Sequence, residues 1–348
     1  MGAKAFLVTG ASGFLGYHVC KYLISRDKAV RGIDIEPFGY SDISDSIAFC
    51  KGDIRDRQLL AEAMRGVDVV IHGAAALPLC PRREIFSVNV DGTRNILQTA
   101  CELGVKRVIF ISSTAVYGIP KEHPVDENYP LKGVGPYGES KIEAEKICLE
   151  FREEGMCVPI LRPKTFAGPM RLGVFQILCD WVQNGKNIPI VGNGNNKYQL
   201  LHIDDLLEAI YLAATAPASK ANDTFNVGAT EFKTMKADLQ ALLDYAGFGK
   251  RVRPFPSWLV IPALKTLEYL HLSPLYEWIY ETADKDHYVS VDKFQRELGW
   301  RPEKSTADVW IDTYRWYLEE GKIGEMETGI THRVAWKQGM LKFIKLFF

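Results

Sequence analysis

The 348-residue sequence has almost no net charge, and it lacks closely spaced cysteine pairs, internal repeats and low-complexity tracts. It holds 42 lysine and arginine residues against 43 aspartate and glutamate residues, a formal net charge of −1, so nothing indicates a surface for nucleic acid. None of the seven cysteines lies in a Cys-x-x-Cys pair, which favours reduced thiols in a cytoplasmic protein. No His, Cys and carboxylate spacing suggests a zinc site, and we expect no signal peptide before the first apolar run.

A glycine-rich turn near the N-terminus is the most informative feature that is present. An apolar run at 5–8 is followed by Gly-x-x-Gly-x-x-Gly at 10–16 and an amphipathic stretch at 17–25. This order predicts a strand, a tight turn and a helix. A helix N-terminus attracts anions, and glycines let the backbone approach a pyrophosphate closely. The residues expected at a dinucleotide are Gly10, Gly13, Phe14, Leu15 and Gly16.

An acidic residue follows at the spacing expected after such a turn. The apolar stretch 29–33 ends at Asp34, with Ile35 next. A carboxylate at this place accepts hydrogen bonds from a ribose diol and repels a 2′-phosphate. The sequence therefore predicts NAD rather than NADP, with Asp34 and Ile35 at the cofactor.

Apolar runs alternate with helical patterns over the first 165 residues. The expected strands are 5–9, 29–33, 47–50, 68–72, 107–112 and 158–162, and the expected helices lie near 16–25, 57–64, 86–103 and 137–154. This alternation predicts an α/β fold, a doubly wound parallel sheet with a site at the carboxyl ends of its strands. After residue 165, glycine and proline interrupt shorter elements. We expect a Rossmann domain over 1–165, a smaller, intermittent C-terminal substrate lobe over 166–330 and a tail over 331–348.

The tail is cationic and amphipathic. Residues 332–348 hold four lysine and arginine side chains, no acid, and apolar residues at helical spacing. Two interpretations remain open: a helix at an anionic membrane surface, or a helix packed on the protein itself or on a second subunit. The protein is accordingly expected in the cytoplasm, either free or peripheral at the inner membrane surface.

Tyr137 and Lys141 carry the strongest sign of chemistry. They lie four residues apart at the start of a predicted helix, and therefore on one face. A lysine ammonium beside a phenol favours the phenolate, which can exchange a proton with a substrate hydroxyl. The preceding strand ends in Ser112, Ser113 and Thr114, whose hydroxyls could bond the same oxygen.

Together these features resemble the extended short-chain dehydrogenase/reductases of the NAD-dependent epimerase/dehydratase family. The matching segments run in the family's order over about residues 5–210. They are Thr9–Gly16, Gly52–Ile54, His72–Ala75, Asn89–Thr93, Ser112–Gly118, Tyr137–Lys141, Arg162–Pro163 and Leu201–Asp205.

The resemblance implies roles for individual residues. It implies that Ser113 supplies a catalytic hydroxyl, that Tyr137 is the acid/base and that Lys141 is its electrostatic partner. It also implies that Asp53 and Ile54 contact adenine. The further residues expected to line the cofactor are Ala74, Ala75, Asn89, Tyr137, Lys141 and Pro163. A homodimer is expected.

The sequence departs from the family's pattern at several substrate positions. Thr114 and Ala115 stand where sugar 4,6-dehydratases carry Asp-Glu, so water elimination is not expected. Thr165 stands where nucleotide-sugar epimerases usually have asparagine. These epimerases also usually have an arginine in the loop before His202, where it binds the diphosphate bidentately, and this sequence has Lys197 in that loop instead. The residues expected at the substrate are Thr114, Thr165, Lys197 and Gln199.

Three functions are consistent with this pattern. The first is epimerisation of a nucleotide sugar through a keto intermediate. The second is a dehydrogenase of a lipid-like alcohol such as a 3β-hydroxysteroid, which Thr165, the apolar segment 255–282 and the tail favour. The third, a non-catalytic NAD-binding protein, is disfavoured by the intact Ser113, Tyr137 and Lys141.

Overall fold

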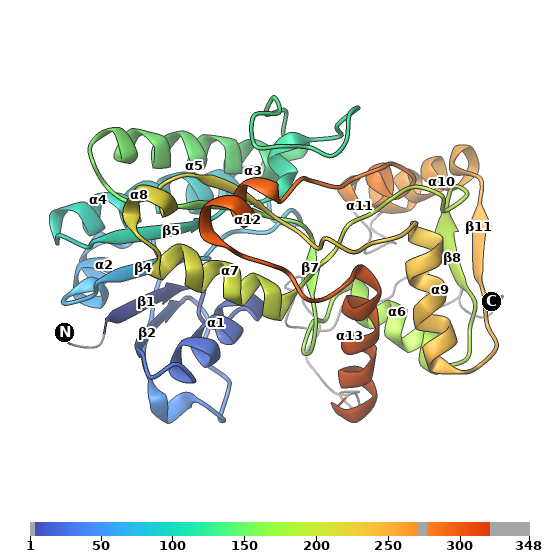
Figure 1. Cartoon of the computed structure of the whole chain (residues 1–348), viewed down its shortest axis with the longest axis horizontal. Coiled ribbons are helices and arrows are strands. Elements are labelled where there is room, and N and C mark those ends of the chain that lie inside the picture. The colour runs from blue at the N-terminus through green and yellow to red at the C-terminus, as the bar shows by residue number, and fades with distance from the viewer. Residues whose placement is uncertain (1–3, 271–276, 321–348) are drawn as a thin grey trace.

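A parallel sheet of seven strands forms the core of the larger part of the molecule, on the left in Figure 1. The computed structural model describes residues 4–270 and 277–320. The strand order is β10-β6-β5-β4-β1-β2-β3. The strands are β1 (Ala5–Thr9), β2 (Ala29–Asp34), β3 (Ile47–Lys51), β4 (Val69–His72), β5 (Arg107–Ile111), β6 (Ile160–Pro163) and β10 (Thr224–Val227). All six strands expected from the sequence form, within two residues of their expected bounds, and the doubly wound α/β fold is confirmed.

Helices cover both faces of this sheet because its central strands are apolar on both sides (Figure 1). One face packs against α1 (Phe14–Ile24) and α7 (Ile203–Thr215). The other face packs against α2 (Arg57–Met64), α4 (Gly92–Glu102) and α5 (Gly135–Glu153). Every residue of β5 is buried, as expected of a strand between two helical layers.

The helix expected over 86–103 has a different form. A helical stretch begins with α3 (Arg82–Phe86), passes through a π-helical turn, η2 (Ser87–Asp91), and continues as α4. Inside the π-helical turn, Asn89 is 2% exposed and is hydrogen-bonded to the backbone of Ala76. Such turns are frequent at functional sites, and this one lies beside the loop that follows β4.

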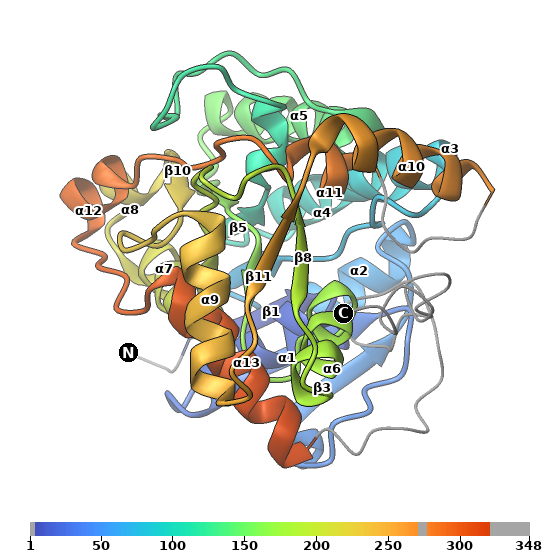
Figure 2. The ribbon, with the colours of Figure 1, turned by 90° about the vertical axis from the view of Figure 1, so that its right-hand side faces the viewer.

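Much of the chain beyond β6 forms a smaller lobe, which faces the viewer in Figure 2. There β8 (Ile188–Val191) pairs in parallel with β11 (Val252–Phe255), and β7 (Phe166–Ala167) pairs with β9 (Leu201–His202). An apolar cluster joins β8 and β11 to α6 (Val174–Gln183), α9 (Met235–Ala246) and α13 (Thr306–Glu320). The remaining elements are α8 (Ala218–Ala221), α10 (Ser257–Tyr269), α11 (Glu277–Thr282), α12 (Asp292–Leu298) and the 3₁₀ turns η1 (Ser44–Ser46) and η3 (Thr114–Tyr117).

The C-terminal range contributes two elements to the sheet part of the molecule. Strand β10 and helix α7 come from the range that the sequence assigns to the substrate lobe, yet they complete the central sheet and one of its helical layers. The boundary at residue 165 therefore divides the chain but not the sheet. The tail at 331–348 lies outside the described residues. In the part that is described, no helix is both long and apolar enough to cross a membrane.

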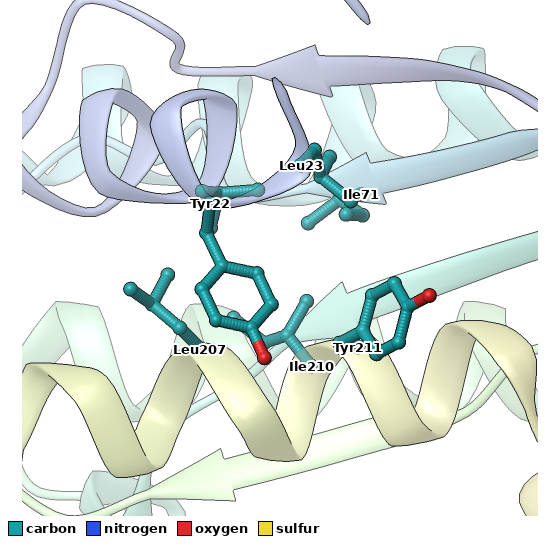
Figure 3. A pocket seen from close by; sticks show the side chains of 7 residues that line it. Tyr22, Leu23, Ile71, Leu207, Ile210 and Tyr211 are labelled. Atoms are coloured by element: carbon teal, nitrogen blue, oxygen red, sulfur yellow. The ribbon is translucent and has the colours of Figure 1, made fainter. Parts of the chain in front are cut away.

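Helices α1 and α7 pack against each other on one face of the sheet (Figure 3). Tyr22 and Leu23 of α1 face Leu207 and Ile210 of α7 above Ile71 of β4, leaving a gap with no room for a water molecule. Helix α7, which directly follows β9, is thus held to the sheet by apolar side chains.

Candidate active site

The glycine turn has the shape that a bound pyrophosphate requires. Gly10 has a φ of +73°, and its backbone N–H donates to the Ile33 carbonyl at 2.9 Å. A Cβ at Gly16 would lie 2.0 Å from the Gly10 carbonyl oxygen, so no larger residue fits there. Gly13 caps α1 without a side-chain hydrogen bond to the helix. The first turn of α1 thus presents its backbone N–H groups beside Phe14 and Leu15, which suits an anion.

Asp34 stands directly against this turn. Its Oδ2 accepts a hydrogen bond from the Ser12 backbone N–H at 3.0 Å, and its Oδ1 accepts one from the Glu36 N–H at 2.9 Å. The carboxylate is therefore fixed at the end of β2, where a ribose diol would meet it. Ile35, next in the chain, is 60% exposed. The residues therefore fit a dinucleotide with an unphosphorylated ribose.

An arginine that the sequence pattern did not indicate, Arg55, contacts the residues expected around adenine. The Arg55 guanidinium lies 2.5 Å from Asp53 and holds the pKa of that carboxyl below its usual range. Arg55 also donates to Ser87 in the π-helical turn at 3.2 Å. Ile54 is 5% exposed and packs where a Cβ at Gly92 would clash with it.

Asn89 connects the loop after β4 to the start of α5. Its Oδ1 accepts from the Ala76 backbone N–H at 2.8 Å, and its Nδ2 donates to the Ser140 hydroxyl at 3.0 Å. Ser140 in turn donates to the Tyr137 carbonyl at 2.8 Å. In the same loop, the Ala74 backbone N–H donates to Thr9, and Ala75 is half-buried. A side chain expected to line the cofactor thus also holds the segment that carries Tyr137.

Ser113, Tyr137 and Lys141 come together at the carboxyl end of β5. Ser113 caps the η3 turn by accepting from the Ala115 backbone N–H at 3.1 Å, and it is hydrogen-bonded to Tyr137. Lys141 is 3% exposed, and its Nζ lies 5.9 Å from the Tyr137 ring centroid. That Nζ donates to the Ile111 carbonyl at 2.9 Å. The three residues that the sequence grouped therefore do share one place.

The electrostatics of this group differ from the sequence expectation. Burial raises the pKa of Tyr137 to about 12, an effect larger than the lowering by Ser113 and by Arg171. Burial also lowers the pKa of Lys141 to about 8. Both groups are desolvated, and for Tyr137 this burial outweighs the hydrogen bond from Ser113 and the charge of Arg171.

A buried polar network lies behind these residues. Glu145 accepts from the Ser112 hydroxyl at 2.5 Å and from Arg162 at 2.5 Å, and Arg162 donates to the Tyr117 hydroxyl at 2.8 Å. The Tyr117 hydroxyl donates to Asn226 of β10 at 2.7 Å. Glu145 was missed at the sequence level, although it follows Tyr137 and Lys141 at the same four-residue spacing. Pro163 ends β6 directly after Arg162.

The residues expected at the substrate differ in their burial and contacts. Thr114 is buried in the η3 turn, and the Thr165 hydroxyl lies 3.5 Å from the Tyr198 hydroxyl. Lys197 is exposed, with its Nζ 5.7 Å from the Tyr288 ring centroid.

Gln199 requires a correction. It is 1% exposed, its Nε2 donates to the Ala229 carbonyl at 2.6 Å, and its Oε1 accepts from the Val289 N–H at 3.0 Å. The amide is thus committed to the backbone, and a substrate contact is not supported.

No metal site accompanies this arrangement in the ranges 4–270 and 277–320, where no three His, Cys, Asp or Glu side chains are grouped to hold an ion. All seven cysteines fall in these ranges and carry free thiols.

Relatives of this chain include both uncharacterised proteins and enzymes. The uncharacterized protein y4nG of Sinorhizobium fredii is 37% identical over 98% of this chain and 85% of that protein. Human sterol-4-alpha-carboxylate 3-dehydrogenase, decarboxylating, is 34% identical over 61% of this chain and 58% of that enzyme. An Escherichia coli O157:H7 N-acetyl-alpha-D-glucosaminyl-diphospho-ditrans,octacis-undecaprenol 4-epimerase is 34% identical over 59% of this chain and 61% of that enzyme. This chain therefore spans about three fifths of each of these two enzymes.

The fold has solved counterparts. DesIV, a dTDP-glucose 4,6-dehydratase from Streptomyces venezuelae crystallised with NAD, superposes with a TM-score of 0.74 at 27% identity, over 92% of this chain and 98% of that one. A family model described as the NAD dependent epimerase/dehydratase family matches residues 6–228. The chain therefore belongs to the NAD-dependent epimerase/dehydratase family, and NAD is its cofactor.

Proposed function

We propose that this protein epimerises a hydroxyl-bearing carbon of a nucleotide sugar through a keto intermediate. The observation that carries the proposal is the grouping of Ser113, Tyr137 and Lys141 at the same edge of the sheet as the glycine turn. Carboxyl ends of neighbouring parallel strands meet at this edge, so the cofactor and the substrate hydroxyl would share it.

Tyr137 is the proposed acid/base. Its phenolic oxygen takes the proton of the substrate hydroxyl, and Ser113 holds the same oxygen by a hydrogen bond. When bound, NAD supplies the hydride acceptor that oxidation of the carbon requires. Because burial raises the pKa of Tyr137 to about 12, its ionisation depends on nearby positive charge, of which Arg171 is one source in the described residues. Lys141, whose Nζ donates to the Ile111 carbonyl at 2.9 Å, is its proposed electrostatic partner.

The residues around Ser113 do not support elimination of water. A 4,6-dehydratase needs a second acid/base pair, and the segment 112–118 contains no carboxylate; Thr114 and Ala115 occupy the positions in question. We therefore expect no 4-keto-6-deoxy sugar when the protein is incubated with NAD and dTDP-glucose or another nucleotide hexose. Detection of that product by mass spectrometry would remove this part of the proposal.

A second function, oxidation of a lipid-like alcohol, is favoured by a specific surface. Helix α10 and the residue after it expose Trp258 (78%), Leu259 (55%), Tyr269 (84%) and Leu270 (53%). Such an apolar surface suits a lipid substrate or a lipid interface. The human relative is named for a sterol and the E. coli relative for a polyprenol-linked sugar. Contact of residues 332–348 with a membrane and formation of a homodimer remain proposals of the same kind.

Cofactor retention separates the two functions. An epimerase returns its hydride and is expected to purify with NAD bound, whereas net oxidation requires NAD to exchange. The protein would be denatured and its released NAD quantified, and thermal shifts would then be compared for UDP-sugars, dTDP-sugars and sterols. Stabilisation by a nucleotide sugar together with retained NAD is the expected result. Stabilisation by sterols alone with freely exchanging NAD would favour the second function.

A further inference from the structure

A buried lysine lies beside the candidate active site without a described anionic partner. Lys164 follows the last residue of β6 and is 1% exposed. Its Nζ is hydrogen-bonded to Nδ1 of His287, which is 2% exposed, and lies 4.8 Å from the Tyr198 ring centroid. Within the described ranges, no carboxylate approaches Lys164 to ion-pair distance. This contrasts with Arg162, two residues earlier, which is paired with Glu145 at 2.5 Å.

The surroundings of Lys164 are poor in negative charge. Burial lowers the pKa of Lys164 well below its usual range, and burial and Lys164 together lower that of His287. His123 is the next titratable group, its pKa lowered by burial and by Lys164 and raised by Asp286. A charged amine would be costly here, because a buried ion needs a counter-charge.

The position of Lys164 connects it to the chemistry. The Ser112 backbone N–H donates to the Leu161 carbonyl at 2.7 Å, so the residues following β5 and β6 lie side by side. His287 Nε2 lies 3.3 Å from the carbonyl oxygen of Gly118, which ends the turn that Ser113 begins. Tyr198, against which the amine rests, also reaches the Thr165 hydroxyl. The amine therefore lies behind the region where the substrate hydroxyl must meet Ser113 and Tyr137.

A purely structural role explains this lysine poorly. The hydrogen bond to His287 requires only a neutral donor, which a glutamine would supply without the cost of burying an amine. A lysine gains an advantage when an anion enters, because it can then become charged and pair with it.

We propose that Lys164, supported by His287, recognises a carboxylate that the substrate carries near the hydroxyl to be oxidised. The inference rests on the proposed function in that it uses the same site, and it adds the chemical class of the substrate: an acid, such as a nucleotide-linked uronic acid or a carboxylated sterol.

Two matched ligand pairs test this inference, with the NAD-loaded full chain. The members of each pair differ at the carboxylate: UDP-glucuronate against UDP-glucose, and a 4-carboxysterol against the same sterol without the carboxyl group. Calorimetry in two buffers of different ionisation enthalpy measures affinity and proton uptake together. In at least one pair the acid should bind tenfold more tightly than its neutral partner, with net proton uptake, because the bound carboxylate raises the pKa of Lys164 that burial lowers.

Variants assign the effect to the amine. In Lys164→Met and Lys164→Gln the preference should fall to within threefold and the proton uptake should disappear, while NAD affinity stays unchanged. Lys164→Gln keeps a donor for His287 and therefore serves if Lys164→Met fails to fold. Lys220→Met, on the exposed helix α8, is the control and should behave as the wild type.

The outcomes separate this inference from the proposed function. It is overturned if neither acid is preferred, or if the preference survives in both Lys164 variants. If UDP-glucose is then still epimerised and Tyr137→Phe abolishes that activity, the proposed function stands alone. If only the carboxysterol shows the Lys164-dependent preference, the inference stands and the nucleotide-sugar assignment fails.

Discussion

The central sheet and the lobe beyond β6 are held together by different kinds of interaction. In the sheet, backbone pairing between apolar strands sets the register, as between β1 and its neighbours β2 and β4. The lobe has strand pairs and an apolar cluster of its own, but in addition single polar side chains bond to distant backbone groups: Gln199 to Ala229 and Val289, and Asn196 to Ala283 and Lys285. The first kind of interaction follows from local sequence patterns, whereas the second depends on which distant segments meet.

Asp205 shows the same contrast at the junction. Its carboxylate accepts from the Glu303 and Lys304 backbone N–H groups at 2.8 and 3.1 Å, and its carbonyl accepts from the Trp300 indole at 3.0 Å. One residue at the start of α7 thus fixes the chain that leads into α13. His202 caps the same helix by accepting from the Asp204 N–H at 3.2 Å. We infer that this His-x-x-Asp run acts as an anchor between the two regions.

The largest expected effect is a loss of catalytic activity in a variant whose two regions stay folded. Tyr137→Phe removes the acid/base hydroxyl while the ring still packs, so kcat/KM should fall by about 10²- to 10⁴-fold with little change in NAD affinity. Tyr245→Phe, at an exposed tyrosine of α9, is the matched control and should keep full activity. Steady-state kinetics and NAD titration test this, and near-normal turnover of Tyr137→Phe would rule out the mechanism. Lys141→Met should weaken both binding and rate.

The next effect would break the anchor between the regions. Asp205→Ala removes a buried carboxylate and leaves two partly buried backbone N–H groups without their acceptor, so the free energy of unfolding should fall by about 2–3 kcal/mol. Asp204→Ala is the matched control, since that side chain is 68% exposed and should change stability by no more than about 0.5 kcal/mol. Urea titrations of both variants make the measurement. Equal stabilities would mean that Asp205 does not join the two regions.

Much of the sheet could be predicted from the sequence, because it follows from local patterns, whereas the contacts in the lobe depend on distant segments. Its strands are short apolar runs followed by glycine, aspartate or serine, and the Tyr137–Lys141 spacing is local. The contact between Lys164 and His287 could not be predicted, because it joins residues 123 positions apart. Gln199 was misread for a similar reason: its partners belong to segments 30 and 90 residues away. Burial, which sets the pKa of Tyr137, also depends on such distant contacts.

A smaller effect concerns acid stability in the sheet. His72 is 1% exposed and lies between the Thr9 and Thr93 hydroxyls, and burial lowers its pKa to about 3. The unfolded chain takes up a proton below about pH 6.5 and the native site does not, so stability is lost as the pH falls from there towards 3. At pH 5 the contribution of His72 should be about 2 kcal/mol less favourable than at pH 7.5. His72→Gln should lack this part of the pH dependence in urea titrations, and an unchanged dependence would contradict it.

The smallest expected effect concerns the preference for NAD over NADP that Asp34 gives the sheet. Asp34 is fixed by the Ser12 and Glu36 backbone N–H groups, so its charge stands where a 2′-phosphate would have to lie. Asp34→Asn keeps an acceptor oxygen but removes the charge, and it should narrow the preference for NAD over NADP by about tenfold, or about 1.4 kcal/mol. Asp34→Ala should narrow the preference too, but with weaker NAD binding, because the N–H groups that hold the turn lose their acceptor. Calorimetric titration of both cofactors against the wild type and the two variants distinguishes charge from turn geometry. Equal affinities of the wild-type protein for NAD and NADP would show that Asp34 does not select the cofactor, and the ribose would then have to be read elsewhere on the turn.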